Sequence, residues 1–265
     1  MKKLFISLLS AIFVLTAMSV SPTLASYPRQ KVVIVVGPVG AKTRHYKTIA
    51  NGLADVAKDY GAQVIKIYSP YATWARVKKY AQKANLFIYL GHGNGYPSPY
   101  SWSTKTKDGL GLNSRYGHGN YNVKYYGEYY IKTYIKFAKN AVVLLNHLCY
   151  ASGSAEPGMA SPSLSTAKKR VDNYAAGFLS AGARAVFAYG YSEGAKLIRD
   201  LYRTSSSFKY IFKHGTYATP GSYIYSARSR RHPRMHMILD PWYRGAYYRS
   251  VVGKLYITAA QWRAG

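Results

Sequence analysis

Acidic residues are scarce in this sequence. Its 265 residues include 9 Asp and Glu but 37 Lys and Arg, which gives a formal net charge of +28 at pH 7. A charge of this size attracts anionic polymers without specific contacts, so we predict an anionic cell-wall polymer or anionic surface as partner, with nucleic acid bound unspecifically at most. The alternative is a solvated basic surface without a partner. His232 and His236 lack a helical context and a set of acidic partners, so we predict no metal site and no cofactor.

Cysteine occurs once, as Cys149. A single cysteine excludes an intramolecular disulfide. Exported proteins usually pair their cysteines, so a lone thiol in such a protein is either a reactive group or a small buried apolar residue.

Long apolar runs are absent after the first one, which covers residues 4–20. That run follows a positively charged start and precedes the helix-breaking Pro22 and small residues up to Ala25. The pattern is typical of a signal peptide, residues 1–25, and an uncleaved membrane anchor is the alternative. We therefore predict an exported, bacterial-type protein, secreted or associated with the cell envelope. After signal removal we predict no transmembrane segment and a net charge of about +26.

Apolar runs alternate with helical patterns along residues 31–203. The predicted strands are residues 31–36, 63–68, 86–90, 141–146 and 184–189. The predicted helices are residues 49–57, 73–83, 125–140, 164–181 and 194–203, and residues 94–121 are predicted as a long polar loop. This alternation indicates an α/β fold with a mostly parallel central sheet covered by helices on both faces.

Arg and Tyr dominate the last part of the chain, residues 204–265. Short extended segments are predicted there, at residues 222–227, 235–239 and 247–252. We interpret residues 26–203 as one α/β domain and residues 204–265 as a basic, Tyr/Arg-rich C-terminal extension packed on it.

Reactive side chains follow two of the predicted strands: His92 comes after residues 86–90, and Cys149 after residues 141–146. The carboxyl ends of neighbouring parallel strands meet at one edge of a sheet, so His92 and Cys149 can approach each other if these strands are adjacent. A thiol nucleophile and a histidine acid/base are the minimum apparatus for acyl transfer from a peptide. The basic surroundings predict a lowered pKa for the Cys149 thiol.

These residues resemble the motifs of the caspase-like cysteine peptidases, a superfamily with legumain-type, gingipain-type and CHAT-type members. In that superfamily a His-Gly pair follows one apolar strand and the nucleophilic Cys follows the next, and here Cys149 comes 57 residues after His92. Residues 149–154, Cys-Tyr-Ala-Ser-Gly-Ser, look like the turn after the legumain nucleophile. Residues 176–186 are similar to the helix-to-strand segment that follows the Cys in CHAT-type members. The resemblance covers residues 31–203 and implies a caspase-like three-layer sandwich.

The resemblance also implies roles for individual residues. By analogy Cys149 is the nucleophile, His92 is the general base and acid, and the backbone N–H groups of Gly93 and Cys149 form the oxyanion hole. The implied activity is that of a secreted cysteine endopeptidase, a hydrolase acting on a peptide or protein substrate. Leu148 departs from the pattern, because many members have a small residue before the Cys, and no residue can be carried over as a specificity determinant.

Four further residues are candidates for supporting roles around this pair: His147, Asp108, Asn113 and Glu128. His147 is two residues from Cys149, and the other three lie on the connection between the two site strands, so we expect them near the mouth of the cleft. The alternatives are a core histidine, a solvated turn and an acid at the start of a helix.

Two other functions stay open on the same scaffold. One is a catalytically silent module that binds the cell envelope through its charge. The other is a Cys/His acyltransferase that passes the acyl group to an acceptor other than water.

Overall fold

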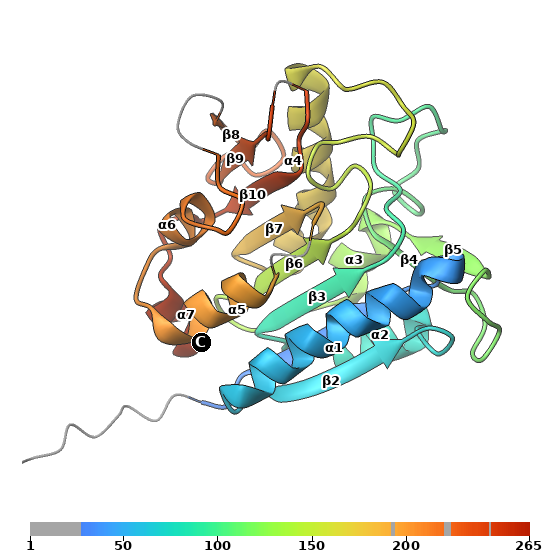
Figure 1. The fold of residues 1–265 in the computed structure, drawn as a ribbon, viewed down its shortest axis with the longest axis horizontal. Helices are drawn as coiled ribbons and strands as arrows, with labels where there is room; N and C mark the ends of the chain where they lie inside the picture. Colours follow the sequence, from blue (N-terminus) through green and yellow to red (C-terminus); the bar gives the residue numbers. More distant parts are fainter. Residues whose placement is uncertain (1–27, 192–193, 220–223, 244) are drawn as a thin grey trace, which may run out of the picture.

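An eight-stranded sheet forms the centre of the computed structural model, which describes residues 28–265 except 192–193, 220–223 and 244. The predicted signal peptide lies outside the described residues. The strand order is β2-β1-β3-β6-β7-β10-β9-β8 (Figure 1). The strands are β1 Lys31–Val36, β2 Gln63–Tyr68, β3 Leu86–Leu90, β6 Val142–Asn146, β7 Ala185–Tyr189, β8 Tyr225–Arg228, β9 His236–Asp240 and β10 Arg249–Gly253.

The first five strands in this order are parallel, and we call them the parallel half of the sheet. Their sequences are rich in β-branched residues; β3, β6 and β7 are buried along their whole length, and β1 along all but its first residue. Such strands are stable only when both faces of the sheet are covered. All five strands were predicted from the sequence to within one residue at each end.

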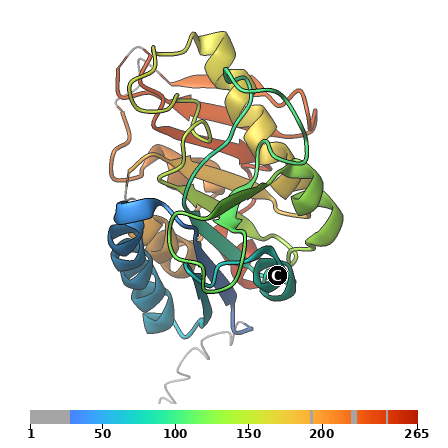
Figure 2. The ribbon, with the colours of Figure 1, turned by 90° about the vertical axis from the view of Figure 1, so that its right-hand side faces the viewer.

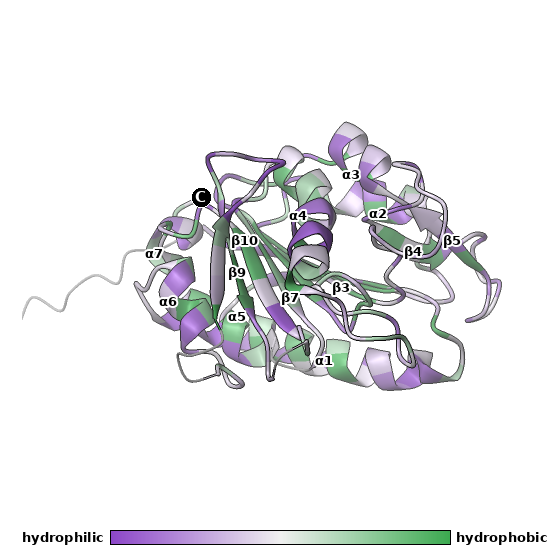
Figure 3. Cartoon of the chain, turned by 90° about the horizontal axis from the view of Figure 1, so that it is seen from above, coloured by the Kyte–Doolittle hydropathy of each residue, from purple (hydrophilic) through white to green (hydrophobic). Residues whose placement is uncertain are grey.

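Helices cover both faces of the sheet, which gives three layers (Figure 3). One face carries α1 Thr43–Asp59, α5 Gly194–Arg203, α6 Phe208–Lys213 and α7 Ala259–Arg263, and the other carries α2 Trp74–Tyr80, α3 Glu128–Tyr134 and α4 Leu164–Ser180. Alternate residues of β1 enter the two cores, Ile34 on the α1 side and Val33 on the α4 side. The predicted α/β class with a mostly parallel central sheet is therefore confirmed. None of the helices in the described ranges has the length and apolarity to cross a membrane.

The last part of the chain extends the same sheet. β10 pairs antiparallel with β7, β9 with β10, and β8 with β9, and we call these three strands the antiparallel half. We predicted short extended segments near these positions in an extension packed on the domain, whereas the structure shows strands that continue the sheet. The physical reason is that the outer backbone groups of the buried strand β7 require hydrogen-bonding partners, which β10 supplies. Figure 2 shows the sheet running from the blue N-terminal strands to the orange and red C-terminal strands.

The connection between β3 and β6 differs from the prediction of a loop followed by one helix. A small second sheet pairs β4 Leu110–Asn113 with β5 Val123–Tyr126, and α3 is short. Gly127 separates β5 from α3 and is pressed against the preceding loop, because an added Cβ would lie 2.4 Å from the Lys107 carbonyl oxygen. The Tyr-rich run therefore forms a strand and then a short helix.

Candidate active site

The loops that follow β1, β3 and β6 meet at the carboxyl edge of the parallel half. β3 and β6 are neighbours, with Leu90 opposite Asn146, so the adjacency expected from the sequence holds. In Figure 1 the arrows of β3 and β6 point the same way, and the loops beyond them lie together. The chain moves from β1 outward to β2, and from β3 in the opposite direction to β6. Such a reversal point is where open parallel sheets bind their ligands.

A cavity of about 780 Å³ lies at this edge. Its wall includes Tyr46 from α1, His92 from the loop after β3, and Cys149 from the loop after β6. His92 is exposed, and Cys149 is half-buried with a free thiol. In the described part of the chain the imidazole and the thiol share the cavity without a direct hydrogen bond. Catalytic hydrogen bonds commonly tighten only when substrate binds.

Gly93 packs directly against the backbone of Cys149. A Cβ atom at Gly93 would lie 2.1 Å from the Cys149 carbonyl oxygen and 2.9 Å from the Cys149 nitrogen, so only glycine fits there. Within the described ranges, neither residue donates its backbone N–H to the carbonyl of another residue. The two predicted oxyanion donors are therefore adjacent to each other and without a backbone acceptor.

The pKa of the Cys149 thiol is raised and that of the His92 imidazole is lowered, and both shifts disfavour a thiolate–imidazolium ion pair. Burial raises the pKa of the Cys149 thiol, the Glu156 carboxylate raises it further, and Lys42 opposes both effects. Although part of the His92 side chain is exposed, partial desolvation of the residue in the cavity lowers its pKa, with Glu156 acting in the opposite direction. The expectation of a lowered thiol pKa is wrong, because burial and one nearby carboxylate outweigh the positive charges. The resting pair is a neutral thiol and a neutral imidazole, and such an imidazole is able to accept a proton.

Glu156 is the site residue that the sequence did not reveal. It lies on the loop after β6, lines the cavity with Cys149, and accepts hydrogen bonds from the hydroxyls of Tyr150 (2.8 Å) and Tyr100 (3.2 Å). None of the ion pairs found among the described residues involves Glu156. The sequence offered one signal that could have identified it: Glu156 is one of only nine acidic residues, and it comes seven residues after the lone cysteine.

His147 also lines the cavity, as part of the wall formed by the loop after β6. Its ring packs on Tyr46 with 5.3 Å between centroids, and burial lowers its pKa. Its φ of 60° is in the left-handed region, which non-glycine residues adopt rarely. This turn redirects the chain after β6 and so positions Cys149.

The other three predicted supporting residues belong to the scaffold behind the cavity and are not in its wall. Asp108 is buried, accepts the Tyr96 backbone N–H at 3.0 Å, and has a pKa raised by burial to about 7. The buried Asn113 side chain accepts the Ala72 backbone N–H and donates to the Gly119 carbonyl. Glu128 pairs with Arg231 at 2.6 Å. Their bonding accounts for their burial, and Asp108 adjoins the cavity through its neighbour Lys107.

Arg170 of α4 fastens the two site loops to each other. Its guanidinium donates to the carbonyl oxygens of Pro97 (2.7 Å) and Ser154 (2.9 Å), and it lies 4.8 Å from the ring centre of Tyr150. Pro97 belongs to the loop after β3, and Ser154 to the loop after β6. A buried arginine that bridges these loops fixes their separation, and hence the width of the cavity.

No group of three or more His, Cys, Asp or Glu side chains suited to a metal ion occurs among the residues that the structure describes. No family model matches the sequence, and no match was found among curated proteins. Among solved structures, the chain is similar to the Arg-specific cysteine proteinase gingipain R, with 13% identity and a TM-score of 0.37. The similarity covers 87% of this chain and 61% of that one, so the chain spans less than two thirds of that proteinase's length.

Proposed function

We propose that the protein is a secreted cysteine endopeptidase of caspase-like type that hydrolyses peptide or protein substrates. The observation that carries the proposal is that His92 and Cys149, each just beyond one of two neighbouring parallel strands, line one cavity at the carboxyl edge of the sheet. Residues brought together from distant parts of a chain at such an edge are typical of a catalytic site.

The chemistry follows from the neutral state of both groups. As the Cys149 sulfur attacks the substrate carbonyl carbon, His92 takes the thiol proton, and the carbonyl oxygen becomes negatively charged. The N–H groups of Gly93 and Cys149 stabilise that oxygen. The C–N bond then breaks, and His92 returns the proton to the leaving amine. Water hydrolyses the resulting thioester, with His92 again acting as base, and the free thiol is restored.

Selective alkylation combined with peptide turnover tests this function. Iodoacetamide should label Cys149 in the wild type, and Cys149→Ala and His92→Ala should each lose turnover of a fluorogenic peptide mixture. His236→Ala is the matched control, since His236 is exposed on β9 in the antiparallel half. Turnover that survives in Cys149→Ala would rule out the proposed nucleophile. Acyl transfer to an added amine in place of hydrolysis would identify the acyltransferase alternative.

A second candidate function, adhesion to an anionic envelope polymer, is favoured by the turn between β8 and β9. The buried carboxylate of Asp172 accepts the Ser229 hydroxyl and the backbone N–H groups of Arg230 and Arg231. These bonds hold an arginine-rich turn in one conformation on α4, with Arg230 exposed. The guanidinium groups of Arg230 and Arg231 pair with Asp172 and Glu128. The exposed Arg228 and Arg234 flank this turn, and guanidinium groups suit phosphate recognition.

Binding of the protein to an anionic, phosphate-containing polymer at increasing salt tests this adhesion. Attraction between the arginine-rich turn and the polymer should weaken steeply as salt rises. Binding that does not respond to salt would contradict it, and equal binding by Cys149→Ala would show that adhesion is independent of the thiol.

A further inference from the structure

An aromatic wall continues the site along the sheet edge toward the antiparallel half. A second cavity, of about 510 Å³, shares Cys149 and Glu156 with the first and is also lined by Tyr191 and Tyr248. Trp242 is not in the wall of this cavity, but its ring contacts both tyrosine rings. Tyr191 lies just after β7, and Tyr248 just before β10, which is antiparallel to β7. Both tyrosines are therefore at the same edge of the sheet as the thiol.

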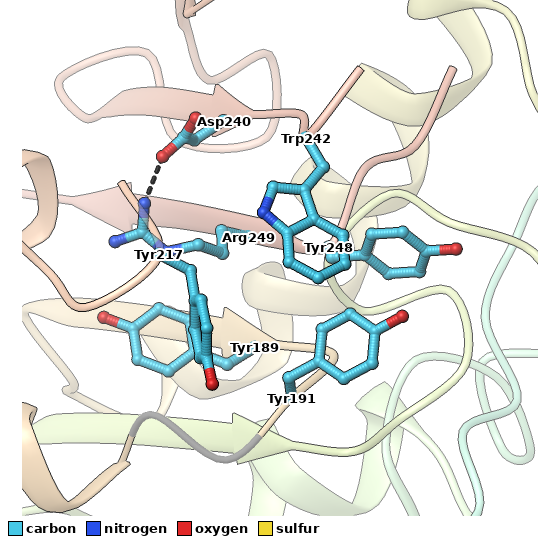
Figure 4. Close-up of a pocket in the computed structure, with 7 residues that line it drawn as sticks. All are labelled: Tyr189, Tyr191, Tyr217, Asp240, Trp242, Tyr248 and Arg249. Atoms are coloured by element: carbon cyan, nitrogen blue, oxygen red, sulfur yellow. Dashed lines mark hydrogen bonds and ion pairs between the residues drawn. The ribbon is translucent and has the colours of Figure 1, made fainter. Parts of the chain in front are cut away.

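The rings of this wall contact one another. The Tyr191 ring centre is 5.0 Å from that of Tyr248 and 5.3 Å from that of Trp242, and the Trp242 and Tyr248 rings meet edge to face at 6.2 Å. Figure 4 shows these three side chains grouped together. Trp242 is 49% exposed and Tyr191 42% exposed, although both are large and apolar. Clustered exposed aromatic side chains beside a cavity indicate a binding surface.

A buried ion pair lies next to these rings, and its two charges neutralise each other. Arg249 pairs with Asp240, both are buried, and the Arg249 guanidinium lies 4.6 Å from the ring centre of Phe212 and 5.6 Å from that of Tyr189. Figure 4 shows Arg249 reaching toward Asp240 beside the group of Tyr191, Trp242 and Tyr248. Since Asp240 is neutralised by this pair, it does not favour a cationic ligand at the wall.

We infer that the wall formed by Tyr191, Trp242 and Tyr248 is a subsite for an aromatic or large apolar side chain of the substrate, close to the bond that Cys149 cleaves. This inference rests on the proposed function. An extended peptide that places its carbonyl at Cys149 has its neighbouring residues within reach of the shared cavity, because each residue advances about 3.3 Å. Ring faces and edges bind such a side chain by burial of apolar surface and by aromatic contacts.

A positional library of fluorogenic peptides measures the preference. With wild type, peptides that carry Phe, Tyr or Trp at one position near the cleaved bond should have a kcat/KM roughly tenfold or more above that of the Ala peptide, since even one methylene in an apolar pocket is worth about tenfold. Trp242→Ala should reduce that ratio to below about threefold. The matched control is Tyr256→Ala, which removes an exposed aromatic ring on the loop after β10 and should leave the ratio unchanged.

Binding to Cys149→Ala separates this inference from the proposed function. Calorimetry should show tighter binding of the Phe peptide than of the Ala peptide, and this difference should disappear when Trp242→Ala is added. Tight, Trp242-dependent binding with no turnover in wild type would uphold the subsite and refute the peptidase. Turnover with no aromatic preference, or with a preference for Lys or Arg that ignores Trp242→Ala, would overturn the subsite and leave the peptidase standing.

Discussion

The parallel and antiparallel halves of the sheet differ in the kind of residues that they bring to their shared edge. The parallel half brings reactive side chains together, because the carboxyl ends of β3 and β6 point to one edge and carry His92 and Cys149 there. The antiparallel half has a buried ion pair, Arg249–Asp240, and an aromatic surface at that same edge. In the proposed function, the parallel half supplies the reacting groups, and the antiparallel half supplies an aromatic surface beside them.

The two halves also differ in how residues reach this edge. In the parallel half each loop leaves the edge and returns by a helix, so the groups that meet there come from distant parts of the sequence. In the antiparallel half β9 ends where β10 begins, with Asp240 opposite Arg249. Trp242 and Tyr248 of this short connection therefore build the wall together with Tyr191, which comes from the loop after β7. The following predictions test this division, in order of expected effect.

Gly93→Ala should have the largest effect on peptide turnover, and it tests whether the chemistry depends on close packing in the parallel half. The added Cβ meets the Cys149 backbone, which must move, and a displacement of about 1 Å at a catalytic group costs about 100-fold in rate. Peptide turnover and iodoacetamide labelling measure the change.

Gly52→Ala in α1 is the control, because nothing lies within 4 Å of its added Cβ. It should retain activity and gain about 0.5–1 kcal/mol of stability, since alanine is the better helix residue. Circular dichroism checks that both variants fold. Full activity in Gly93→Ala would show that the contact is irrelevant to the chemistry.

Arg249→Met tests whether the antiparallel half is one cooperative unit with the rest. It leaves the buried Asp240 carboxylate unpaired, which should lower the free energy of unfolding by about 3–5 kcal/mol in urea titrations. Adding Asp240→Leu should restore most of this loss. Lys58→Met, which removes an exposed ion pair, should have no measurable effect. Two separate unfolding transitions would indicate that the two halves unfold independently.

Glu156→Gln tests the electrostatics of the chemical half. Glu156 raises the pKa values of both Cys149 and His92, so its neutralisation should move both to lower pH. In wild type, the alkylation rate of Cys149 should reach half its maximum above pH 9.0, and the acid limb of kcat/KM should lie below pH 6.5. The variant should shift both midpoints downward. Asp59→Asn, at the exposed end of α1, is the charge-matched control. Equal shifts in both variants would show that Glu156 has no specific effect on Cys149 and His92.

Asp108→Asn should have the smallest effect on peptide turnover and tests, through stability, the scaffold behind the parallel half. The folded pKa is about 7, above the ordinary 3.8, so this group's contribution to stability declines as pH rises between these values. Asn keeps the acceptor for Tyr96 and tolerates the φ of 60°. Calorimetry should find the melting temperature of the variant, relative to wild type, higher at pH 8 than at pH 5. A difference independent of pH would contradict this assignment.

The sequence predicted the parallel half well because each of its strands is a local signal. A run such as residues 31–36 is apolar on both faces, and only a covered parallel strand accommodates it. Strand β5 and helix α3 were harder to predict from the sequence. The same Tyr-rich pattern suits a strand or a helix, and the packing of Gly127 decides where one ends and the other begins. The strands of the last part of the chain were predicted near their positions, but the pairing of β10 with β7, which joins them to the sheet, is a tertiary contact without a local sequence signal.

The site was predictable only where it coincides with strand ends. His92 and Cys149 follow apolar runs directly, so their proximity could be inferred from the topology. Arg170 acts through carbonyl oxygens, which have no sequence signature, and Glu156 is placed by the closure of two loops. Trp242 and Tyr191 are two aromatics among 29 Tyr and 4 Trp, and only the fold makes them neighbours.

The outermost strands of the sheet bear on how the protein behaves when concentrated. β2 exposes Gln63 and Lys66, and β8 exposes Ser226 and Arg228, so each border of the sheet carries a positive side chain. An open border of a sheet is a template for strands of other molecules, and like charges oppose that association. Combined with the high net charge of the chain, these borders favour a dispersed protein in dilute salt and a greater tendency to self-associate where salt screens the repulsion.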